Sequence, residues 1–316
     1  MSTPAHAFGI GLVQRACSPD AAANVRSALE GVREAASRGA QIVCLQEMFN
    51  NTYFCKTEDF ARFDLAEPID GPDAGPTITA CRDAAKALNV AIIAPIFEKR
   101  APGLYHNSAA VIDAGGELLG VYRKMTIPDD PLYYEKFYFT PGDADTPSPD
   151  SLGTKVAAAS GYRVFRTRFA RVGVLICWDQ WYPENARITT LLGAEALFYP
   201  TAIGWHPREK AAHGTVQADA WRTIQRGHAI ANELFVAAVN RTGFEPEPGA
   251  DGIEFFGGSF IADPAGQVVA EAPVSEEAVL IHQCDRRAIE ERRRHWPFLR
   301  DRRVDAFAPI TRRWLT

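Results

Sequence analysis

The feature that most constrains the fold is a series of apolar runs, each the length of one β-strand, spread along almost the whole chain. These runs are FGIGLVQ, QIVCLQ, VAIIAPIF, NSAAVID, ELLGVYRK, YRVF, VGVLIC, ALFYP, FVAAVN, SFIAD, QVVAEA and VLIHQCD. About a dozen strands are more than one open sheet usually holds. The pattern therefore predicts an α/β fold in which two β-sheets pack face to face with helices outside them.

Segments of helical periodicity alternate with these runs in the early and middle chain. Residues 20–38 have apolar side chains on one helical face, with Asp20 as an N-cap and Gly39 as a stop. The same periodicity predicts helices over 77–88, 183–192 and 218–233. Turn residues at 113–116 and 263–266 each join two strands as a hairpin, so the sheets should be mixed.

The chain has no linker that would divide it, so residues 1–316 are predicted to form one domain. The turn-rich stretch 143–160 is interpreted as a long surface loop. Acidic residues interrupt the basic run near residue 290, which favours a solvated helix over a nucleic-acid patch. We expect this C-terminal extension, about 286–316, to dock on a partner subunit.

The overall charge and composition exclude several classes of function. A net charge of -5 without a basic stripe argues against nucleic acid and against an anionic membrane surface as partners. No apolar stretch approaches membrane-spanning length, and the six scattered cysteines are typical of free thiols in the cytoplasm. The seven histidines lack the spacing of metal ligands, and no P-loop, G-x-S-x-G or G-x-G-x-x-G motif occurs.

Three of the apolar runs end in a reactive side chain. Glu47 follows residues 41–45, Lys124 follows 118–122, and Cys177 follows 172–176. Taken singly, a buried cysteine is usually a packing residue, and a Glu or Lys after a strand is usually solvated. Taken together, they supply a thiol nucleophile, a base for its proton and a cation for a developing oxyanion, which the backbone N–H of Trp178 could also bind. We therefore expect the three strand ends to converge in one crevice.

The sequence around these three residues resembles the nitrilase, or carbon-nitrogen hydrolase, superfamily, which uses a Glu-Lys-Cys triad in this chain order. LQEMF carries Glu47, YRKMTIP carries Lys124 and ICWDQWYPE carries Cys177. The resemblance implies a nitrilase-like α-β-β-α sandwich, no metal or cofactor, and a homodimer or larger assembly. It also implies a further active-site glutamate, Glu135 in YYEKFYFTPGD, for which the alternative is a structural ion pair with Lys136 or Arg123.

Within the superfamily, the resemblance is strongest to the N-carbamoylputrescine amidases and runs over nearly the whole chain. The matching stretches are QEMFNNTYFC, EKFYFTPGD, ICWDQWYPENAR, YPTAIG, QRGHAIAN, AAVNRTGFE, GGSFIADPAG and WPFLRDRRVDAF. This implies hydrolysis of N-carbamoylputrescine to putrescine, carbon dioxide and ammonia. The alternative is a β-ureidopropionase-like amidase for N-carbamoyl amino acids, or an ω-amidase. The length of segment 144–160 and the pair Trp205-His206 after YPTAIG depart from the family pattern.

A putrescine tail is a flexible cation, so its pocket should present carboxylates or aromatic faces. The predicted substrate contacts are Trp178, Tyr133, Tyr53, Asp130 and Trp205, and further candidates are Asp129, Trp181 and Glu184. Any of them could instead be a packing aromatic or a solvated acid. A substrate that carries a carboxylate would call for arginine or backbone donors, whereas the acidic pair 129–130 favours a cation. A non-enzymatic scaffold is the competing class, and the intact triad counts against it.

Overall fold

The computed structural model describes residues 6–144 and 161–316, and its core is two six-stranded β-sheets. The first sheet has the order β15 (Ala278–Asp285), β1 (Ala7–Gln14), β2 (Ile42–Leu45), β3 (Ala91–Ala101), β4 (Leu104–Ile112), β5 (Leu118–Arg123). The second has the order β14 (Val268–Glu271), β13 (Phe260–Ala262), β10 (Phe235–Asn240), β8 (Ala196–Thr201), β7 (Arg171–Val174), β6 (Val164–Arg166). Each of these strands overlaps one of the apolar runs of the sequence, although β3 and β4 extend beyond theirs.

Both sheets are mixed, with parallel strands in the middle and antiparallel strands at the margins. In the first sheet β1, β2 and β3 are parallel, and in the second β7, β8 and β10 are parallel. Parallel neighbours need a long crossover, and helices supply it here. The crossover helices are α1 (Ala21–Ser37), α2 (Pro76–Leu88), α4 (Pro183–Leu191) and α5 (Lys210–Asn232).

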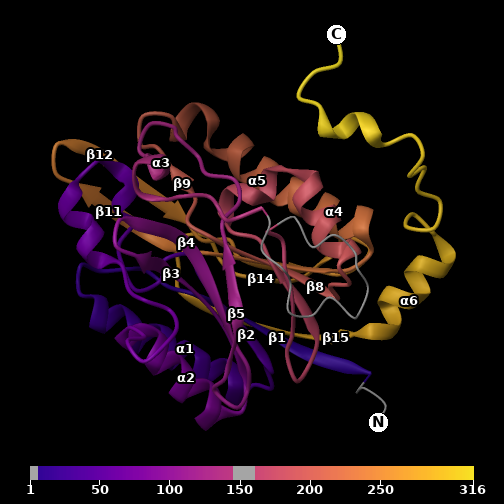
Figure 1. Cartoon of the computed structure of the whole chain (residues 1–316), viewed down its shortest axis with the longest axis horizontal. Helices are drawn as coiled ribbons and strands as arrows, with labels where there is room; N and C mark the ends of the chain where they lie inside the picture. The colour runs from indigo at the N-terminus through magenta and orange to yellow at the C-terminus, as the bar shows by residue number, and fades with distance from the viewer. Residues whose placement is uncertain (1–5, 145–160) are drawn as a thin grey trace.

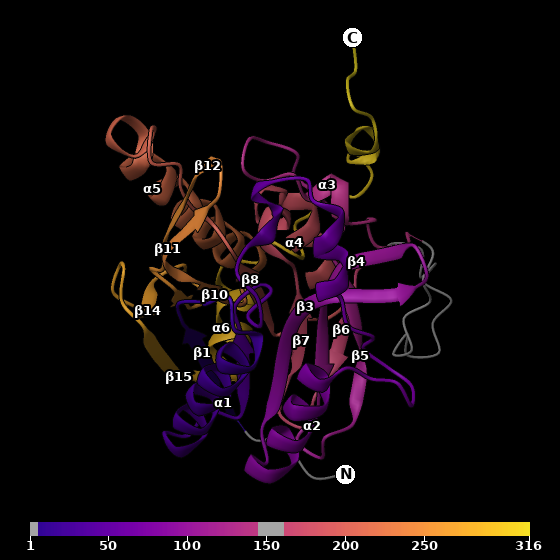
Figure 2. The ribbon, with the colours of Figure 1, turned by 90° about the vertical axis from the view of Figure 1, so that its left-hand side faces the viewer.

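The helices form the outer layers of a four-layered molecule. Figure 1 shows α1 and α2 on one side of the sheets and α4 and α5 on the other. In Figure 2, α1 and α2 lie in front of the strands of the first sheet, against which they pack. The predicted α-β-β-α sandwich of two mixed sheets flanked by helices is therefore confirmed.

The core has one cluster between the sheets and another beneath the first helical layer. Phe8, Ile10 and Leu12 on β1 belong to the same buried cluster as residues of β7 and β8. The opposite face of β1 packs so closely on α1 that a Cβ added at Gly11 would lie 3.1 Å from Ala35 Cβ. All four residues of β2 are buried, as expected of a strand covered on both faces.

The N-terminus of α1 agrees with the prediction from the sequence, whereas that of α5 does not. Asp20 accepts a hydrogen bond from the Ala23 N–H at 3.0 Å, which is the predicted N-cap of α1. The predicted start of α5 at residue 218 is wrong, because the helix begins at Lys210. Gly214 lowers the helix propensity of the first turns, but its carbonyl accepts a hydrogen bond from Trp205 Nε1 at 2.8 Å. A tertiary contact thus stabilises a segment of weak local preference.

A small third sheet was not predicted from the sequence. It has the order β11 (Thr242–Glu247), β12 (Ala250–Phe256), β9 (Gly204–Trp205). The sequence of its hairpin contains glycines and prolines, and the only buried residues of β11 are Thr242 and Glu245, so no apolar run marks it. Short helical turns complete the secondary structure: η1 (Phe54–Lys56), η2 (Phe60–Leu65), α3 (Glu135–Tyr138), η3 (Cys177–Trp181) and η4 (Ala308–Thr311).

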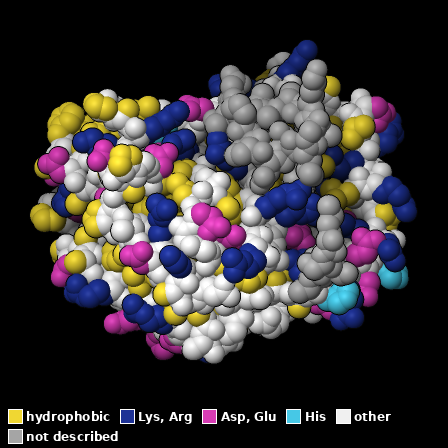
Figure 3. Space-filling view, turned by 60° about the horizontal axis from the view of Figure 1, so that its bottom comes forward, with side chains coloured by type: hydrophobic (Ala, Val, Ile, Leu, Met, Phe, Trp, Pro, Cys, Tyr) yellow, Lys and Arg dark blue, Asp and Glu magenta, His cyan; other side chains and the backbone are white. Residues whose placement is uncertain are grey.

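The C-terminal helix α6 (Arg286–His295) leads into a tail, residues 296–316, that extends away from the sandwich (Figure 1). The predicted surface loop 143–160 lies almost entirely outside the described residues. On the face shown in Figure 3, acidic and basic side chains are interspersed. Among the helices of residues 6–144 and 161–316, none has the length and apolarity needed to cross a membrane.

Candidate active site

The structure brings the three reactive strand ends together between the carboxyl edges of the two sheets. Glu47 follows β2, Lys124 follows β5, and Cys177 is the first residue of η3, just beyond β7. Lys124 Nζ lies 3.0 Å from Glu47 Oε1. Cys177 is close enough to Lys124 that its thiolate form would raise the pKa of that lysine. Such an edge is where ligands bind in open α/β sheets.

Glu135, at the start of α3, is the second carboxylate beside Lys124. Its Oε2 lies 2.6 Å from Lys124 Nζ, and its Oε1 accepts a hydrogen bond from the Tyr53 hydroxyl at 2.8 Å. Arg123, one of the alternative partners considered for Glu135, instead forms an ion pair with Glu98 at 2.5 Å. Glu135 is therefore part of the cluster around Lys124.

The side chains of Glu47, Lys124 and Glu135 are all 0% exposed. Within this cluster, burial and the charges of neighbouring groups shift pKa values in opposite directions. Burial alone would lower the pKa of Lys124, but Glu135 and Glu47 outweigh it and hold that pKa well above its ordinary value. Burial raises the pKa of Glu135 to about 7, although Lys124 opposes the shift. The two shifts have different causes, because the carboxylates raise the pKa of Lys124 whereas burial raises that of Glu135, but both favour retention of a proton in the cluster.

The two oxygens of Glu47 have different surroundings. Oε1 accepts hydrogen bonds from Asn107 Nδ2 at 2.7 Å and from Lys124 Nζ. Oε2 is buried and has no hydrogen-bond partner among the described residues. Because buried polar atoms are usually paired, this free oxygen is the natural acceptor for a proton from a neighbouring group or ligand.

Cys177 is held in a left-handed backbone conformation, with φ at 44°. Burial raises the pKa of its thiol well above the ordinary value, Glu47 adds to the rise, and Lys124 opposes it. The resting side chain is thus a neutral thiol. It needs a base within reach to become a nucleophile.

A buried carboxylate, Asp179, fixes the turn that carries Cys177. It accepts hydrogen bonds from the N–H of Ile176 at 2.9 Å, from the Tyr122 hydroxyl at 2.8 Å and from the N–H of Thr126 at 2.9 Å. Tyr122 and Thr126 stand on either side of Lys124 in the chain. One side chain therefore ties the cysteine's turn to the lysine's strand end.

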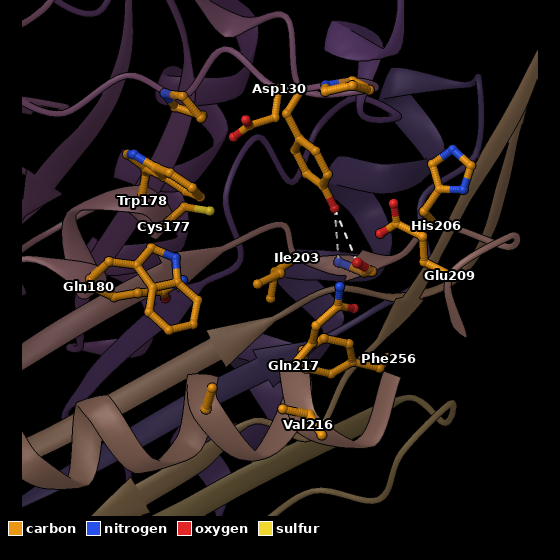
Figure 4. Close-up of a pocket in the computed structure, with 16 residues that line it drawn as sticks. Asp130, Cys177, Trp178, Gln180, Ile203, His206, Glu209, Val216, Gln217 and Phe256 are labelled. Carbon is orange, nitrogen blue, oxygen red and sulfur yellow. Dashed lines mark hydrogen bonds between the residues drawn. The ribbon is translucent and has the colours of Figure 1, made fainter. Parts of the chain in front are cut away.

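A cavity of about 520 Å³ opens beside Cys177. Figure 4 shows Cys177 and Trp178 on one side of it, with His206 and Glu209 opposite. The predicted residues Asp130, Tyr133, Trp178 and Trp181 line this cavity. The Tyr133 hydroxyl accepts a hydrogen bond from the N–H of Gly204 at 3.2 Å, which joins two of its walls.

The other predicted contacts lie outside the cavity lining. Tyr53 lies behind Glu135, and Trp205 packs on Phe256 with ring centroids 5.2 Å apart. Neither Asp129 nor Glu184 is among the lining residues. The sequence assigned no role to four residues that shape the site: Asn107, Asp179, Glu209 and Arg241. His206, which lines the cavity, was singled out from the sequence as part of the departure from the family pattern. Asp179 and Arg241 do lie in matched stretches, ICWDQW and AAVNRTGFE, whereas no sequence signal distinguishes Glu209.

No group of three or more metal-binding side chains occurs within the described ranges. A sandwich of two mixed sheets with a buried carboxylate, lysine and cysteine at one edge is the architecture of a cysteine-dependent hydrolase of the nitrilase type. The sequence pattern of the carbon-nitrogen hydrolases matches residues 9–294. The chain belongs to the carbon-nitrogen hydrolase family, enzymes that cleave carbon-nitrogen bonds other than peptide bonds.

Individual proteins agree with this assignment. The chain is 44% identical over 301 residues to an N-carbamoylputrescine amidase of Arabidopsis thaliana, covering 94% of this chain and 93% of the relative. It is 37% identical to a citrullinase of Francisella tularensis, covering 96% and 98%. A crystal structure of a carbon-nitrogen hydrolase from Helicobacter pylori superposes with a TM-score of 0.87 at 41% identity, covering 98% of this chain and 100% of that one.

Proposed function

We propose that this chain hydrolyses N-carbamoylputrescine, with Cys177 as the nucleophile, Glu47 as the general base, and Lys124 and Glu135 as further members of the active site. The observation that carries the proposal is the cluster beside the cavity, in which Lys124 contacts both carboxylates and Glu47 Oε2 remains unpaired. The 44% identity to an N-carbamoylputrescine amidase supports the choice of substrate.

In the first half of the reaction, Glu47 takes the proton of the Cys177 thiol as Sγ attacks the carbamoyl carbon. The carbonyl electrons move onto oxygen, and Lys124 with the N–H of Trp178 stabilises that oxyanion. When the intermediate collapses, the carbon-nitrogen bond to the amine breaks. Glu47 gives its proton to the departing nitrogen, and the enzyme holds a carbamoyl thioester.

In the second half, Glu47 removes a proton from water as the water oxygen attacks the thioester. Collapse of this second intermediate breaks the carbon-sulfur bond, and Glu47 returns the proton to Cys177. The product is carbamate, which decomposes to carbon dioxide and ammonia. Glu135 holds Lys124 in place through both halves, and Tyr53 fixes Glu135 by its hydroxyl.

The walls of the cavity support a cationic rather than an anionic tail. Asp130 and Glu209 both line it, and Trp178, Trp181 and Tyr133 add aromatic faces. Trp205 contributes indirectly, because it packs beneath the wall at Phe256. We assign the terminal ammonium of the substrate to these two acidic side chains of the cavity lining.

A second candidate substrate is citrulline, favoured by the 37% identity to a citrullinase. Citrulline carries the same carbamoyl group on a chain that ends in both an ammonium and a carboxylate. Among the described residues, no arginine or lysine lines the cavity, which favours the simple amine.

Ammonia release from a panel of substrates tests the proposal. The panel is N-carbamoylputrescine, citrulline, N-carbamoyl-β-alanine and a simple ω-amide, each assayed for kcat/KM. We expect N-carbamoylputrescine to be preferred. A preference for N-carbamoyl-β-alanine or for the ω-amide would contradict the assignment, and a preference for citrulline would select the second candidate.

We further propose that the single domain 1–316 forms a homodimer or larger assembly through its C-terminal extension. The support is the tail after α6, which carries exposed apolar side chains such as Trp314, 78% exposed, and Ile310, 64% exposed. A tail of this kind gains stability by burial against a second copy. We also propose a cytoplasmic location, since none of the six cysteines forms a disulfide.

A further inference from the structure

The matched stretch AAVNRTGFE includes a buried arginine that the proposed chemistry does not use. Arg241 follows β10 directly and is 0% exposed. An arginine is rarely buried so completely unless its guanidinium is paired and hydrogen-bonded. Its partners therefore indicate what it does.

Those partners are backbone carbonyls of the segment that carries Glu47. Arg241 Nη2 donates hydrogen bonds to the carbonyl oxygens of Glu47 at 2.7 Å and Met48 at 3.0 Å. Arg241 Nη1 donates to the carbonyl oxygen of Asn51 at 3.1 Å. One guanidinium thus binds three carbonyls of the turn that follows β2.

This turn has an unfavourable local geometry. Met48 adopts φ at 47°, a left-handed conformation that a side chain with a Cβ rarely takes. Buried carbonyl oxygens without donors would destabilise it further. The guanidinium supplies those donors in a fixed planar arrangement, which a lysine ammonium does not reproduce.

The counter-ion of Arg241 connects to the second carboxylate of the site. Arg241 Nη1 lies 2.6 Å from Glu245 Oε1, and Glu245 Oε2 accepts a hydrogen bond from the N–H of Tyr53 at 2.5 Å. The hydroxyl of Tyr53 in turn donates to Glu135. The Arg241–Glu245 ion pair therefore contacts the backbone of Glu47 and of Tyr53. The side chain of Glu47 contacts Lys124, and the hydroxyl of Tyr53 contacts Glu135.

We propose that Arg241 is a positioning residue for Glu47: it holds the turn 47–51 so that the Glu47 carboxylate stays aligned with Cys177 and Lys124. The inference rests on the proposed role of Glu47 as the base. Arg241 does not line the cavity, so its effect on the reaction is transmitted by the segments that it contacts.

The rate at which iodoacetamide alkylates Cys177, measured by mass spectrometry of the labelled peptide, tests the positioning role of Arg241. The test does not depend on the identity of the natural substrate, because iodoacetamide reacts directly with the thiol. The variants are Arg241→Lys, Glu47→Gln and the double variant, compared with wild type. Arg222→Lys is the matched control, since Arg222 pairs with Glu271 at the surface. Circular dichroism and thermal unfolding show that each variant is folded.

We expect Arg241→Lys to slow alkylation of Cys177 about tenfold or more, because a small misplacement of a base is costly. In the Glu47→Gln background, the same substitution should change the rate by less than about twofold, because the two residues act in series. Arg222→Lys should leave the rate unchanged. If Arg241→Lys does not fold, Glu245→Gln replaces it, and its alkylation rate is compared in the wild-type and Glu47→Gln backgrounds in the same way.

Two results would overturn the proposal. In one, Arg241→Lys lowers the thermal stability but alkylates at the wild-type rate, which would make Arg241 a purely structural residue. In the other, it slows alkylation equally with Glu47 present and with Gln in its place, so that Glu47 is not the residue through which it acts. A wrong substrate assignment would appear only in the ammonia assay. If Glu47→Gln alone leaves alkylation unchanged, the role of Glu47 itself is wrong.

Discussion

The carboxylate of Asp179 accepts a hydrogen bond from the backbone N–H of Thr126 at 2.9 Å and thereby joins the two sheets at the active site. Thr126 lies two residues beyond Lys124 on the first sheet's side, and Asp179 lies two residues beyond Cys177 on the second. The contact keeps the proposed nucleophile and the proposed oxyanion donor at a fixed separation.

Asp179→Asn should therefore lower kcat by about 100-fold, because the amide turns an NH₂ group towards donors that need an acceptor. We also expect a loss of about 1 to 3 kcal/mol in the free energy of unfolding. The measurements are steady-state kinetics and urea unfolding. Tyr122→Phe removes only the hydroxyl contact with Asp179 and should have the smaller effect. Equal kinetics in Asp179→Asn and wild type would show that the contact does not position the site.

Cys177→Ala should reduce turnover by about 10⁶-fold while the protein remains folded, because no other side chain can form the thioester. Ammonia release and circular dichroism measure the two effects. Cys81→Ala is the control, since Cys81 lies on the buried face of α2, in a different core cluster from Cys177. Appreciable turnover by Cys177→Ala would end the proposed mechanism.

Glu135→Gln should remove one component of the dependence of stability on pH. Burial raises the pKa of Glu135 from 4.5 to about 7, so between these values the folded protein holds a proton that the unfolded chain releases. This stabilising contribution is complete below pH 4.5 and is lost as the pH rises through 7, a decline of about 3 kcal/mol in the free energy of unfolding.

Urea unfolding of wild type and Glu135→Gln at pH 5 and pH 7.5 measures this decline as a difference between the two proteins. Titrating groups outside the cluster of Glu47, Lys124, Glu135 and Cys177 contribute equally to both proteins and cancel. Parallel stability curves across this interval would mean that Glu135 does not titrate there.

Glu209→Gln should raise KM for N-carbamoylputrescine about tenfold, because the carboxylate that attracts the substrate's ammonium is lost. A tenfold change corresponds to about 1.4 kcal/mol of binding free energy. The matched control is a substrate rather than a variant. N-carbamoylbutylamine has the same carbon chain but no terminal ammonium, so its KM should be insensitive to the substitution. Asp130→Asn, tested in the same way, determines which acid makes the larger contribution. Equal effects on both substrates would exclude a charge contact.

Deletion of residues 296–316 should reduce the number of subunits per particle, calculated by dividing the molar mass from light scattering after gel filtration by the mass of the shortened chain. The expected cause is loss of the exposed apolar side chains that follow α6. An unchanged number of subunits in the shortened protein would show that subunits associate elsewhere.

Much of the sandwich was predictable because strands covered on both faces must be apolar along their whole length. The run IVCL of β2 is an example, as is FVAAV within β10. The small sheet of β9, β11 and β12 was not predictable. Its strands are partly exposed and contain glycine and proline, so their pairing depends on the contacts they make in the folded protein.

Some residues of the candidate site could likewise be predicted from the sequence, and others could not. Glu47, Lys124 and Cys177 could be selected because each follows an apolar strand, and strand direction limits where such residues point. The roles of Asn107 and Arg241 were not predictable, because each depends on a hydrogen bond to a residue far away in the chain. Trp205 was expected to contact the substrate, but its ring packs between Phe256 and Lys210.

The sequence by itself determined the two-sheet architecture, the mixed strand directions and the chemical types available at three strand ends, because these follow from local patterns of burial and turn formation. Only the tertiary structure decided which oxygen of Glu47 is free, which carboxylates share Lys124 and which acids line the cavity. Those properties depend on distances between segments that the chain brings together only when it folds, and electrostatic and hydrogen-bond energies change steeply with such distances.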